Sequence, residues 1–236
     1  MNSSGVFVEK KEEISEMQHN TVILPYEPVE EFFVEELGEL PKRPVYCAFK
    51  RIMDIIISTC GLIVLLLPMI MIGIAVRCTS KGGALYFQSR LGINGKEFQI
   101  IKFRTMSISA EEEGAQWYGG ENDERVTKLG HFLRKTYLDE LPQLFCILKG
   151  DMSLVGPRPE REIFYAEFEK YIHGFDERLK VTPGLTGLAQ VSGGYNLRPE
   201  EKIVYDIEYM KTRSLWLDFK IMVKTLKVIL SGAGMI

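Results

Sequence analysis

IIISTCGLIVLLLPMIMIGIAV, residues 55–76, is a run of 22 residues without a charged side chain. As one α-helix the run would be about 33 Å long, enough to cross a hydrocarbon core of about 30 Å. Pro68 lies past its middle, lacks an N–H and clashes with the carbonyl of Val64, so it kinks or breaks such a helix. The run therefore predicts a membrane segment with a discontinuity at Pro68, and this segment decides the fold.

Basic side chains flank the apolar run on both sides. They are Lys42, Arg43, Lys50 and Arg51 before it, and Arg77, Lys81 and Arg90 after it. Because an excess of Lys and Arg marks the cytoplasmic flank of a membrane segment, both flanks are expected on the same side. We therefore expect residues 44–80 to form a re-entrant helix, broken at Pro68, that dips into one leaflet. A kinked true span is the alternative, since membranes tolerate proline in spanning helices.

The charge of the chain is unevenly distributed. Residues 1–40 contain ten glutamates and two lysines, whereas the rest contains 27 basic and 22 acidic residues. We expect residues 1–43 to be an acidic, weakly ordered leader and residues 81–236 to form one domain on the cytosolic face. The basic body suits an anionic partner such as a phosphate or a lipid headgroup. No nucleic-acid-binding motif is present, and the four cysteines lack the spacing of a zinc site.

The rest of the chain predicts an α+β fold that is predominantly α-helical. Residues 82–106 alternate apolar and polar side chains around Asn94-Gly95, which predicts a small β-hairpin with a type I′ turn. Residues 107–130 are polar and rich in glycine and predict a mobile loop.

SLWLDFKIMVKTLKVILSG, residues 214–232, predicts a basic amphipathic helix. Its apolar positions are Trp216, Phe219, Val223, Leu226 and Leu230, and Lys220, Lys224 and Lys227 lie on another face. Such a helix lies in a membrane interface or packs its apolar face on a core; the apolar run upstream favours the interface.

LRKTYLDELPQL, residues 133–144, contains two adjacent acids, Asp139 and Glu140. Gly150 is a helix stop, and proline is tolerated only in a first turn, so we expect a helix from about Glu140 to Lys149 with Asp139 near its N-cap. A cap and a partner for the helix dipole would be the purely structural roles of the pair.

Three basic clusters favour a chemical role instead. Lys102 and Arg104 end a predicted strand, Arg134 shortly precedes the acids, and Arg158 lies between Pro157 and Pro159. The arginine fork suits phosphate oxygens, and Mg²⁺ takes one or two carboxylates together with substrate phosphates. This combination predicts phosphoryl transfer with Mg²⁺. Asp206 is either an additional polar group of the site or a surface acid.

Five segments together resemble the bacterial sugar transferase family, the monotopic polyprenyl-phosphate phosphoglycosyl transferases. They are KFRTM, LRKTYLDELPQL, GDMSLVGPRP, VTPGLTGLAQVSG and SLWLDFKI, in the family's order. The resemblance covers residues 45–236 and implies transfer of a sugar-1-phosphate from a UDP-sugar to undecaprenyl phosphate, with release of UMP. This would be the first membrane step of exopolysaccharide, capsule or glycan synthesis.

The resemblance also assigns roles to residues. Asp139 matches the nucleophile that forms a covalent phosphosugar-aspartate, and Glu140 matches the acid that holds Mg²⁺. Arg158, with Pro157 and Pro159, matches the element linked to the uridine nucleotide. Basic family positions near the phosphates match Lys102, Arg104 and Arg134.

The family implies a place at the cytosolic face of the bacterial inner membrane, among membrane lipids. A homodimer and downstream glycosyltransferases are the expected protein partners. The chain departs from the family pattern at Leu67, where serine often precedes the proline, and at Tyr137, where serine is common.

Two other functions are the alternatives to the sugar-phosphate transferase. They are an inactive scaffold of a glycan assembly complex and a metal-dependent phosphatase. Release of UMP would exclude the first, and phosphate release without a lipid-linked product would favour the second.

Overall fold

The structure is a computed structural model that describes residues 22–111, 115–117, 123–193 and 197–231. Helices dominate it, and the strands form four separate two-stranded sheets within this described part. Residues 1–21, the first half of the predicted leader, lie outside the described residues, as does part of the predicted loop at 107–130.

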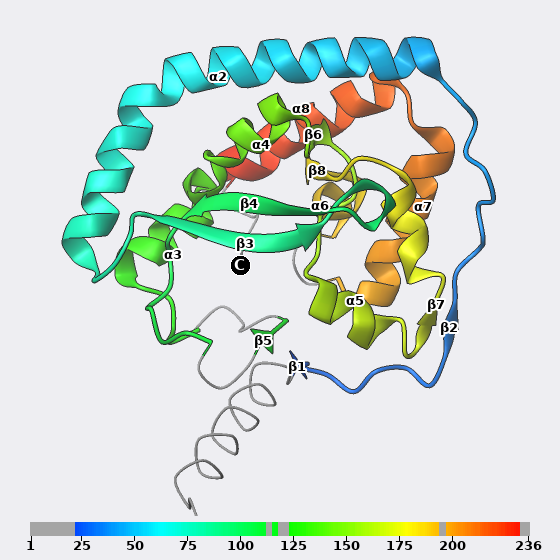
Figure 1. The fold of residues 1–236 in the computed structure, drawn as a ribbon, viewed down its shortest axis with the longest axis horizontal. Coiled ribbons are helices and arrows are strands. Elements are labelled where there is room, and N and C mark those ends of the chain that lie inside the picture. Colours follow the sequence, from blue (N-terminus) through cyan, green and yellow to red (C-terminus); the bar gives the residue numbers. More distant parts are fainter. Residues whose placement is uncertain (1–21, 112–114, 118–122, 194–196, 232–236) are drawn as a thin grey trace, which may run out of the picture.

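The strands and helices follow one another along the chain as follows (Figure 1). They are β1 (Val22–Ile23), β2 (Phe32–Phe33), α2 (Pro44–Thr79), β3 (Leu85–Leu91), η1 (Ile93–Gly95), β4 (Glu97–Phe103), β5 (Ala115–Gln116), α3 (Lys128–Lys135), η2 (Leu138–Glu140), α4 (Gln143–Lys149), β6 (Ser153–Val155), α5 (Glu162–Phe168), β7 (Ile172–His173), η3 (Phe175–Lys180), β8 (Gly184–Thr186), α6 (Leu188–Ser192), α7 (Pro199–Thr212) and α8 (Leu215–Ser231).

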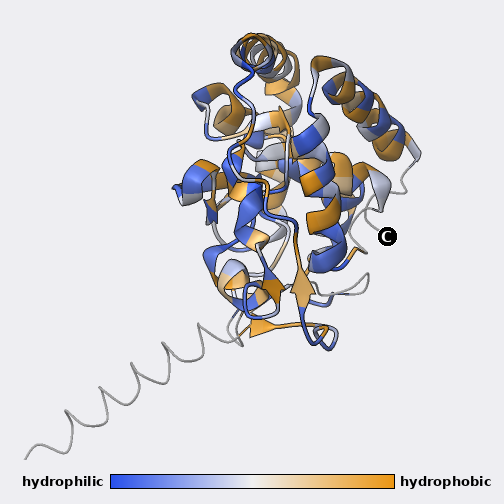
Figure 2. Ribbon diagram, turned by 90° about the vertical axis from the view of Figure 1, so that its right-hand side faces the viewer, coloured by the Kyte–Doolittle hydropathy of each residue, from blue (hydrophilic) through white to orange (hydrophobic). Residues whose placement is uncertain are grey.

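The apolar run lies within α2, a single helix of 36 residues. It is long and apolar enough to cross a membrane. In an 18-residue stretch of the helix the mean hydropathy is 2.7, and only 11% of that stretch is buried. Figure 2, where α2 is seen nearly end-on at the top, shows its largely hydrophobic ribbon. Large apolar side chains such as Ile63, Val64 and Met71 are exposed along it. This surface is what a helix in contact with lipid presents.

The predicted break at Pro68 is a bend. The helix continues through Pro68 to Thr79, and Figure 1 shows it turning a corner rather than separating into two helices. A proline removes one backbone hydrogen bond and pushes away the carbonyl four residues earlier, which bends a helix whose other bonds remain. The re-entrant arrangement, in which both ends of the bent helix lie on the same side of the membrane, stays a prediction.

The inner side of α2 holds it to the domain through polar contacts. Arg51 donates to the carbonyls of Ile147 (2.6 Å) and Leu148 (2.7 Å), at the C-terminal end of α4. Asp54 accepts a hydrogen bond of 2.9 Å from the backbone N–H of Leu154 in β6. The apolar helix is therefore fixed to α4 and β6, the two elements that lie between the acid pair and Arg158 in the chain.

The predicted hairpin is confirmed. Strands β3 and β4 pair in antiparallel register, and Asn94 (φ 56°) and Gly95 (φ 72°) both have the positive φ that a type I′ turn requires. The inner face of β4 contributes Phe98 and Ile100 to a core shared with α4, and Phe103 packs with Val76 of α2. The hairpin thus places the end of β4, with Lys102, between α2 and the acid pair.

A larger core lies under α5, η3 and α7. Its fully buried side chains include Phe168, Phe175 and Ile203. The predicted amphipathic helix is α8, and its inward side chains are Asp218 and Ile221. Trp216 (63% exposed) and Leu226 (59%) instead point away from the protein, so the apolar positions predicted for this helix are not its core-facing side.

Candidate active site

Both acids of the pair lie in η2, a turn of 3₁₀-helix just before α4. The helix α4 begins at Gln143, three residues later than expected, and Asp139 is not its N-cap, because Pro142 occupies that position. Gly150 ends α4 with φ 104°, as predicted. Neither acid therefore acts as the side-chain cap of α4.

Tyr137 introduces this turn in a left-handed conformation, with φ 56° and ψ 14°. Residues other than glycine, asparagine and aspartate rarely adopt this backbone conformation, and the strain costs on the order of 1–2 kcal/mol. The strained residue brings the backbone from α3 around so that both following acids are buried, Asp139 at 4% and Glu140 at 5% exposure.

Glu140 is held by two cations from different elements. Lys102 of β4 donates to its Oε1 at 2.9 Å, and the Arg158 guanidinium pairs with both carboxylate oxygens. Burial alone would raise the pKa of Glu140, but Arg158 and Lys102 outweigh it and lower that pKa far below its usual value. Glu140 is therefore a stable buried anion.

Asp139 has the opposite environment. Its Oδ1 is buried and accepts no hydrogen bond from the described residues. Burial, reinforced by the charge of Glu140, raises the pKa of Asp139 to about 6, while Lys102, Arg134 and Arg158 oppose the rise. Two neighbouring carboxyl groups whose pKa values are shifted in opposite directions can serve different chemical tasks, one as a fixed charge and one as a reactive group.

The backbone around Arg158 is fixed by four consecutive carbonyls. Those of residues 157–160 accept, in order, from the backbone of Gly184 (2.8 Å), the side chain of Arg178 (2.9 Å), the side chain of Arg90 (3.1 Å) and the backbone of Leu91 (3.0 Å). The segment cannot turn without breaking several of these bonds. The Pro-Arg-Pro segment therefore presents Arg158 to Glu140 from a rigid support.

Asp206 belongs to this support. It is 1% exposed and forms an ion pair of 2.7 Å with Arg178, which is 3% exposed. Burial raises the pKa of Asp206 to about 6, against the opposing charge of Arg178. Asp206 is thus a buried acid, connected to the carbonyl of Arg158 through Arg178, and not a surface acid.

VTPGLTGLAQVSG, residues 181–193, packs closely on the same segment. A Cβ added to Gly184 would lie 2.1 Å from the backbone N of Gly156, and one added to Gly156 would lie 2.5 Å from the carbonyl oxygen of Thr182. Only glycine allows the backbone of β8 to approach this closely, and that approach brings the Gly184 N–H to Pro157.

The remaining predicted residues lie at different distances from the acids. Arg134 donates from Nε to the Thr105 hydroxyl at 2.9 Å and contributes to the charge around Asp139. Arg104 instead donates to the backbone carbonyl (3.0 Å) and hydroxyl (2.8 Å) of Ser80, just after α2. The structure thus brings Lys102, Asp139, Glu140 and Arg158 together and directs Arg104 to the end of the apolar helix.

Sequence reasoning missed that Arg90, expected only as a basic flank of the apolar run, and Arg178 hold the Pro-Arg-Pro segment. In the sequence, Arg178 stands in FDERLK, an ordinary alternation of charges, and its burial depends on the fold of η3 against α7. Nothing in that local pattern distinguishes it from a solvated arginine.

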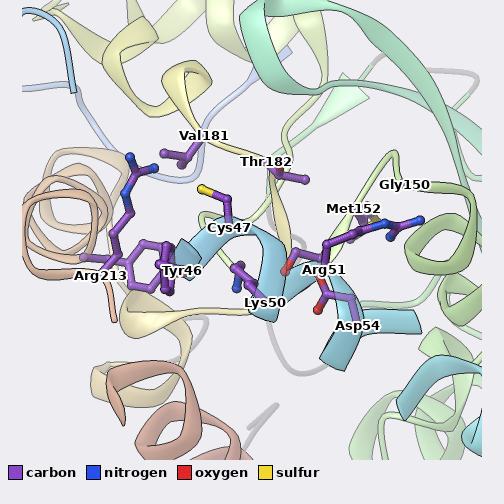
Figure 3. Close-up of a pocket in the computed structure, with 12 residues that line it drawn as sticks. Tyr46, Cys47, Lys50, Arg51, Asp54, Gly150, Met152, Val181, Thr182 and Arg213 are labelled. Carbon is purple, nitrogen blue, oxygen red and sulfur yellow. The ribbon is translucent and has the colours of Figure 1, made fainter. Parts of the chain in front are cut away.

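A pocket between α2 and the domain lies apart from the acid pair. Lys50, Arg51 and Asp54 of α2 line it together with Gly150 and Met152, and Figure 3 shows the Arg51 side chain reaching toward the last two. None of the predicted site residues lines this pocket. The acid pair is instead covered by its own cations, whose side chains are 19% (Lys102) and 20% (Arg158) exposed.

The residues fit a hard divalent cation. Asp139 Oδ1 is open, and two adjacent carboxylates are a donor set that Mg²⁺ accepts when phosphates and water complete its shell. No group of three or more His, Cys, Asp or Glu side chains gathers in the described part of the chain, so a fully protein-built metal cage is absent from it. In that arrangement the Glu140 carboxylate would be shared between the ion and its two cationic partners, Lys102 and Arg158.

The chain is similar in sequence to known proteins over most of its length. The model of the bacterial sugar transferase family matches residues 45–232. An N-acetylgalactosaminephosphotransferase of Aeromonas hydrophila, named as acting on UDP-N-acetylgalactosamine and undecaprenyl phosphate, is 40% identical over 202 residues, 84% of this chain and 48% of the relative. A UDP-glucose:undecaprenyl-phosphate glucose-1-phosphate transferase of Klebsiella pneumoniae is 41% identical over 197 residues, 81% of this chain and 42% of the relative.

A third relative, an undecaprenyl-phosphate galactose phosphotransferase of Salmonella typhimurium, is 41% identical over 200 residues, 78% of this chain and 41% of the relative. The chain spans less than half the length of these curated relatives. The match nevertheless includes α2, the acid pair and the Pro-Arg-Pro segment. The chain belongs to the bacterial sugar transferase family.

Proposed function

We propose that the protein transfers a sugar-1-phosphate from a UDP-sugar to undecaprenyl phosphate, through a covalent intermediate on Asp139. The observation that carries this proposal is the open, buried Oδ1 of Asp139 beside a Glu140 whose charge is already held by Lys102 and Arg158. The names of the relatives support the substrate classes, and they differ in the sugar.

In the first step, Asp139 Oδ1 attacks the phosphorus that carries the sugar. The bond from that phosphorus to the bridging oxygen breaks, and UMP leaves with the electron pair, so that an acyl phosphate joins the sugar-phosphate to Asp139. A carboxylate can serve as such a nucleophile and divides one difficult transfer into two. Its raised pKa, about 6, leaves it anionic at neutral pH while making it more basic than an exposed aspartate.

In the second step, a phosphate oxygen of undecaprenyl phosphate attacks the same phosphorus and displaces the Asp139 carboxylate. The products are undecaprenyl-diphospho-sugar and the regenerated enzyme, and neither step requires a net proton. Arg158, Lys102 and Arg134 offset the negative charge that meets at Asp139. Mg²⁺ held by Glu140 together with the donor phosphates would add further neutralisation of the donor diphosphate.

The bent helix α2 supports the location of this reaction. Its exposed apolar surface would lie in the membrane, while Arg51 and Asp54 fix the elements of the site directly beneath it. We place the site at the headgroup level of the cytosolic face of the bacterial inner membrane, where a lipid phosphate arrives.

A UDP-sugar panel tests the proposal. The full chain in lipid nanodiscs is mixed with undecaprenyl phosphate, Mg²⁺ and one of several UDP-hexoses or UDP-N-acetylhexosamines, and UMP and the lipid product are measured. We expect at least one donor to give UMP and a lipid-linked sugar in equal amounts. Release of inorganic phosphate without a lipid-linked sugar would indicate a phosphatase, and no turnover with any donor would indicate a scaffold.

A further inference from the structure

Gln143, the first residue of α4, is completely buried and has an unsatisfied side chain. Its exposure is 0%, and neither its amide nitrogen nor its amide oxygen has a hydrogen-bond partner among the residues that the structure describes. Buried amide groups are nearly always paired in folded proteins, because desolvation without a partner is costly. A fully unpaired amide therefore needs a reason other than packing.

Gln143 lies one turn beyond the acid pair. From Tyr137 to Phe145 the backbone bonds join residues three apart, as in Glu140 N to Tyr137 O (3.2 Å) and Leu144 N to Leu141 O (3.1 Å). In such a tight helix the side chains at positions i and i+3 lie above one another, which places Gln143 on the face of Glu140. The second unpaired buried group of this segment, Asp139 Oδ1, belongs to the same turn as Glu140.

The chemistry of the amide limits the group that can satisfy it. Its NH₂ donates and its C=O accepts, and both ends are open. A phosphate oxygen at neutral pH only accepts, so it can satisfy one end alone. A hydroxyl both donates and accepts. Two parts of the donor supply hydroxyls, the sugar and the ribose of the uridine. The sugar is joined directly to the reacting phosphorus, whereas the ribose is separated from it by the second phosphate and leaves with UMP, so the sugar hydroxyls are the ones nearest Asp139.

We propose that Gln143 binds a hydroxyl of the sugar that is transferred, and so contributes to the choice of donor. This inference rests on the proposed function, because it takes the sugar-phosphate to be attached at Asp139. Asp139 is itself only 4% exposed, so the site must open before the donor can reach either residue. The same opening serves the nucleophile and the amide.

The test compares the unaltered chain with Gln143→Met, which keeps the length of the side chain and removes its hydrogen bonds. The preferred UDP-sugar and its monodeoxy analogues are assayed for kcat/KM by UMP release in lipid nanodiscs. For the unaltered chain we expect one analogue to react roughly 10- to 100-fold less efficiently than the intact sugar. For Gln143→Met we expect the intact sugar to fall to that level, and the penalty for this analogue to shrink to about threefold or less.

Gln99→Met is the matched control, because it replaces glutamine by methionine at an exposed position of β4. It should retain the full penalty. The thermal midpoint of Gln143→Met should be equal to or higher than that of the unaltered chain, because an unpaired amide is removed from the interior. Gln143→Leu provides a second substitution if the methionine variant does not fold.

Three results would overturn the inference. The first is a penalty that is unchanged for every analogue in the folded variant, which would make Gln143 a core residue only. The second is a loss of activity by the same factor for all donors, which would assign the amide to the phosphate. The third is an unaltered chain that reacts equally well with the intact sugar and with every analogue. Absence of UMP release from the unaltered chain with every intact donor is a separate result, which contradicts the proposed function itself.

Discussion

Asp139 and Glu140 are neighbours in the chain with opposite electrostatic surroundings. Glu140 accepts from Lys102 and Arg158, which lower its pKa, whereas burial raises the pKa of Asp139 to about 6. The folded chain thus stabilises the charge of one acid and disfavours the charge of the other. This division is a physical reason for two acids where one would suffice as a helix cap.

Substitutions of the two acids should change stability in opposite directions. Asp139→Asn removes a buried charge that folding disfavours, so we expect the free energy of unfolding at pH 7 to stay equal or rise by on the order of 1–2 kcal/mol. Glu140→Gln leaves two cations without their anion, so we expect a loss of about 2–4 kcal/mol. Unfolding of both variants in the same lipid nanodisc measures the difference. An equal loss for both would show that the acids do not differ as described.

The residues of the site were predictable to different degrees. The acid pair, Lys102 and Arg158 stand in motifs whose composition indicates phosphate chemistry, and the fold brings these four together. The partner of Arg104 was not predictable, because it depends on where α2 ends. Gln143 was missed because an unpaired amide is a property of the folded interior and has no signature in the sequence.

At the scale of elements, the site depends on how the Pro-Arg-Pro segment is held. The carbonyl of Arg158 accepts from Arg178, which is in turn paired with Asp206 on α7. The segment therefore connects α7 to the acid pair through one buried ion pair. We therefore expect the charge state of Asp206 to affect binding of the proposed UDP-sugar donor.

Acidification should weaken donor binding through Asp206. Its pKa is raised to about 6, so it is ionised at pH 7.5 and takes up a proton as the pH falls to 5.5. Protonation removes the partner of Arg178, and we expect the KM for the UDP-sugar to rise about three- to tenfold over that range. The comparison of KM and kcat between pH 7.5 and 5.5 measures this effect.

Asp206→Asn is the control for that measurement. It should have a raised KM at pH 7.5 and little further rise in KM on acidification, because Asp206 is gone, while kcat should still fall as Asp139, whose pKa is also raised to about 6, takes up a proton. A KM that rises equally with acidification in the variant would mean that another group causes the dependence.

Helix α2 shows what the sequence could and could not indicate about an element. Its apolar length and the disturbance at Pro68 were predictable, since both follow from local chemistry. The disturbance is a bend because the remaining backbone bonds keep the helix continuous from Pro44 to Thr79. The role of Arg51 as a donor to the end of α4 was not predictable, because a flanking arginine has the same appearance in any membrane segment.

The native cysteines provide a test of the re-entrant arrangement. Cys47 and Cys78 are exposed and lie near opposite ends of α2. In variants that retain only one of them, we expect a membrane-impermeant maleimide to label both from the cytosolic side of the membrane alone. Labelling of one cysteine from each side would establish a kinked span and contradict the re-entrant arrangement.

For the whole molecule, the described part of the leader connects distant regions of the chain. Strand β1 pairs with β5 and β2 pairs with β7, both in parallel register. The backbone N–H of Leu37 donates to Glu177 at 3.0 Å, and Glu35 forms an ion pair with Lys211. Acidic composition and prolines indicated weak order for this segment. Its contacts could not be predicted, since each strand has only two residues and its partner lies far along the chain.

Neighbouring phenylalanines of the leader test this packing. Phe32 is partly buried against the larger core, whereas Phe33 is 70% exposed. We expect Phe32→Ala to lower the free energy of unfolding by about 2 kcal/mol, and Phe33→Ala by clearly less. Thermal unfolding of both variants measures the effect. Equal and small effects would show that the leader does not stabilise the domain, and UMP release should remain unchanged in both variants.

In the proposed mechanism, Asp139 becomes covalently attached to the sugar-phosphate. The most direct measurement is the intact mass and peptide mass of the protein after incubation with its UDP-sugar and Mg²⁺, without undecaprenyl phosphate. We predict an added mass of one sugar-phosphate on the peptide containing Asp139, its loss when undecaprenyl phosphate is supplied, and its absence from folded Asp139→Asn. Turnover without any such adduct, or an adduct that persists in Asp139→Asn, would contradict the account.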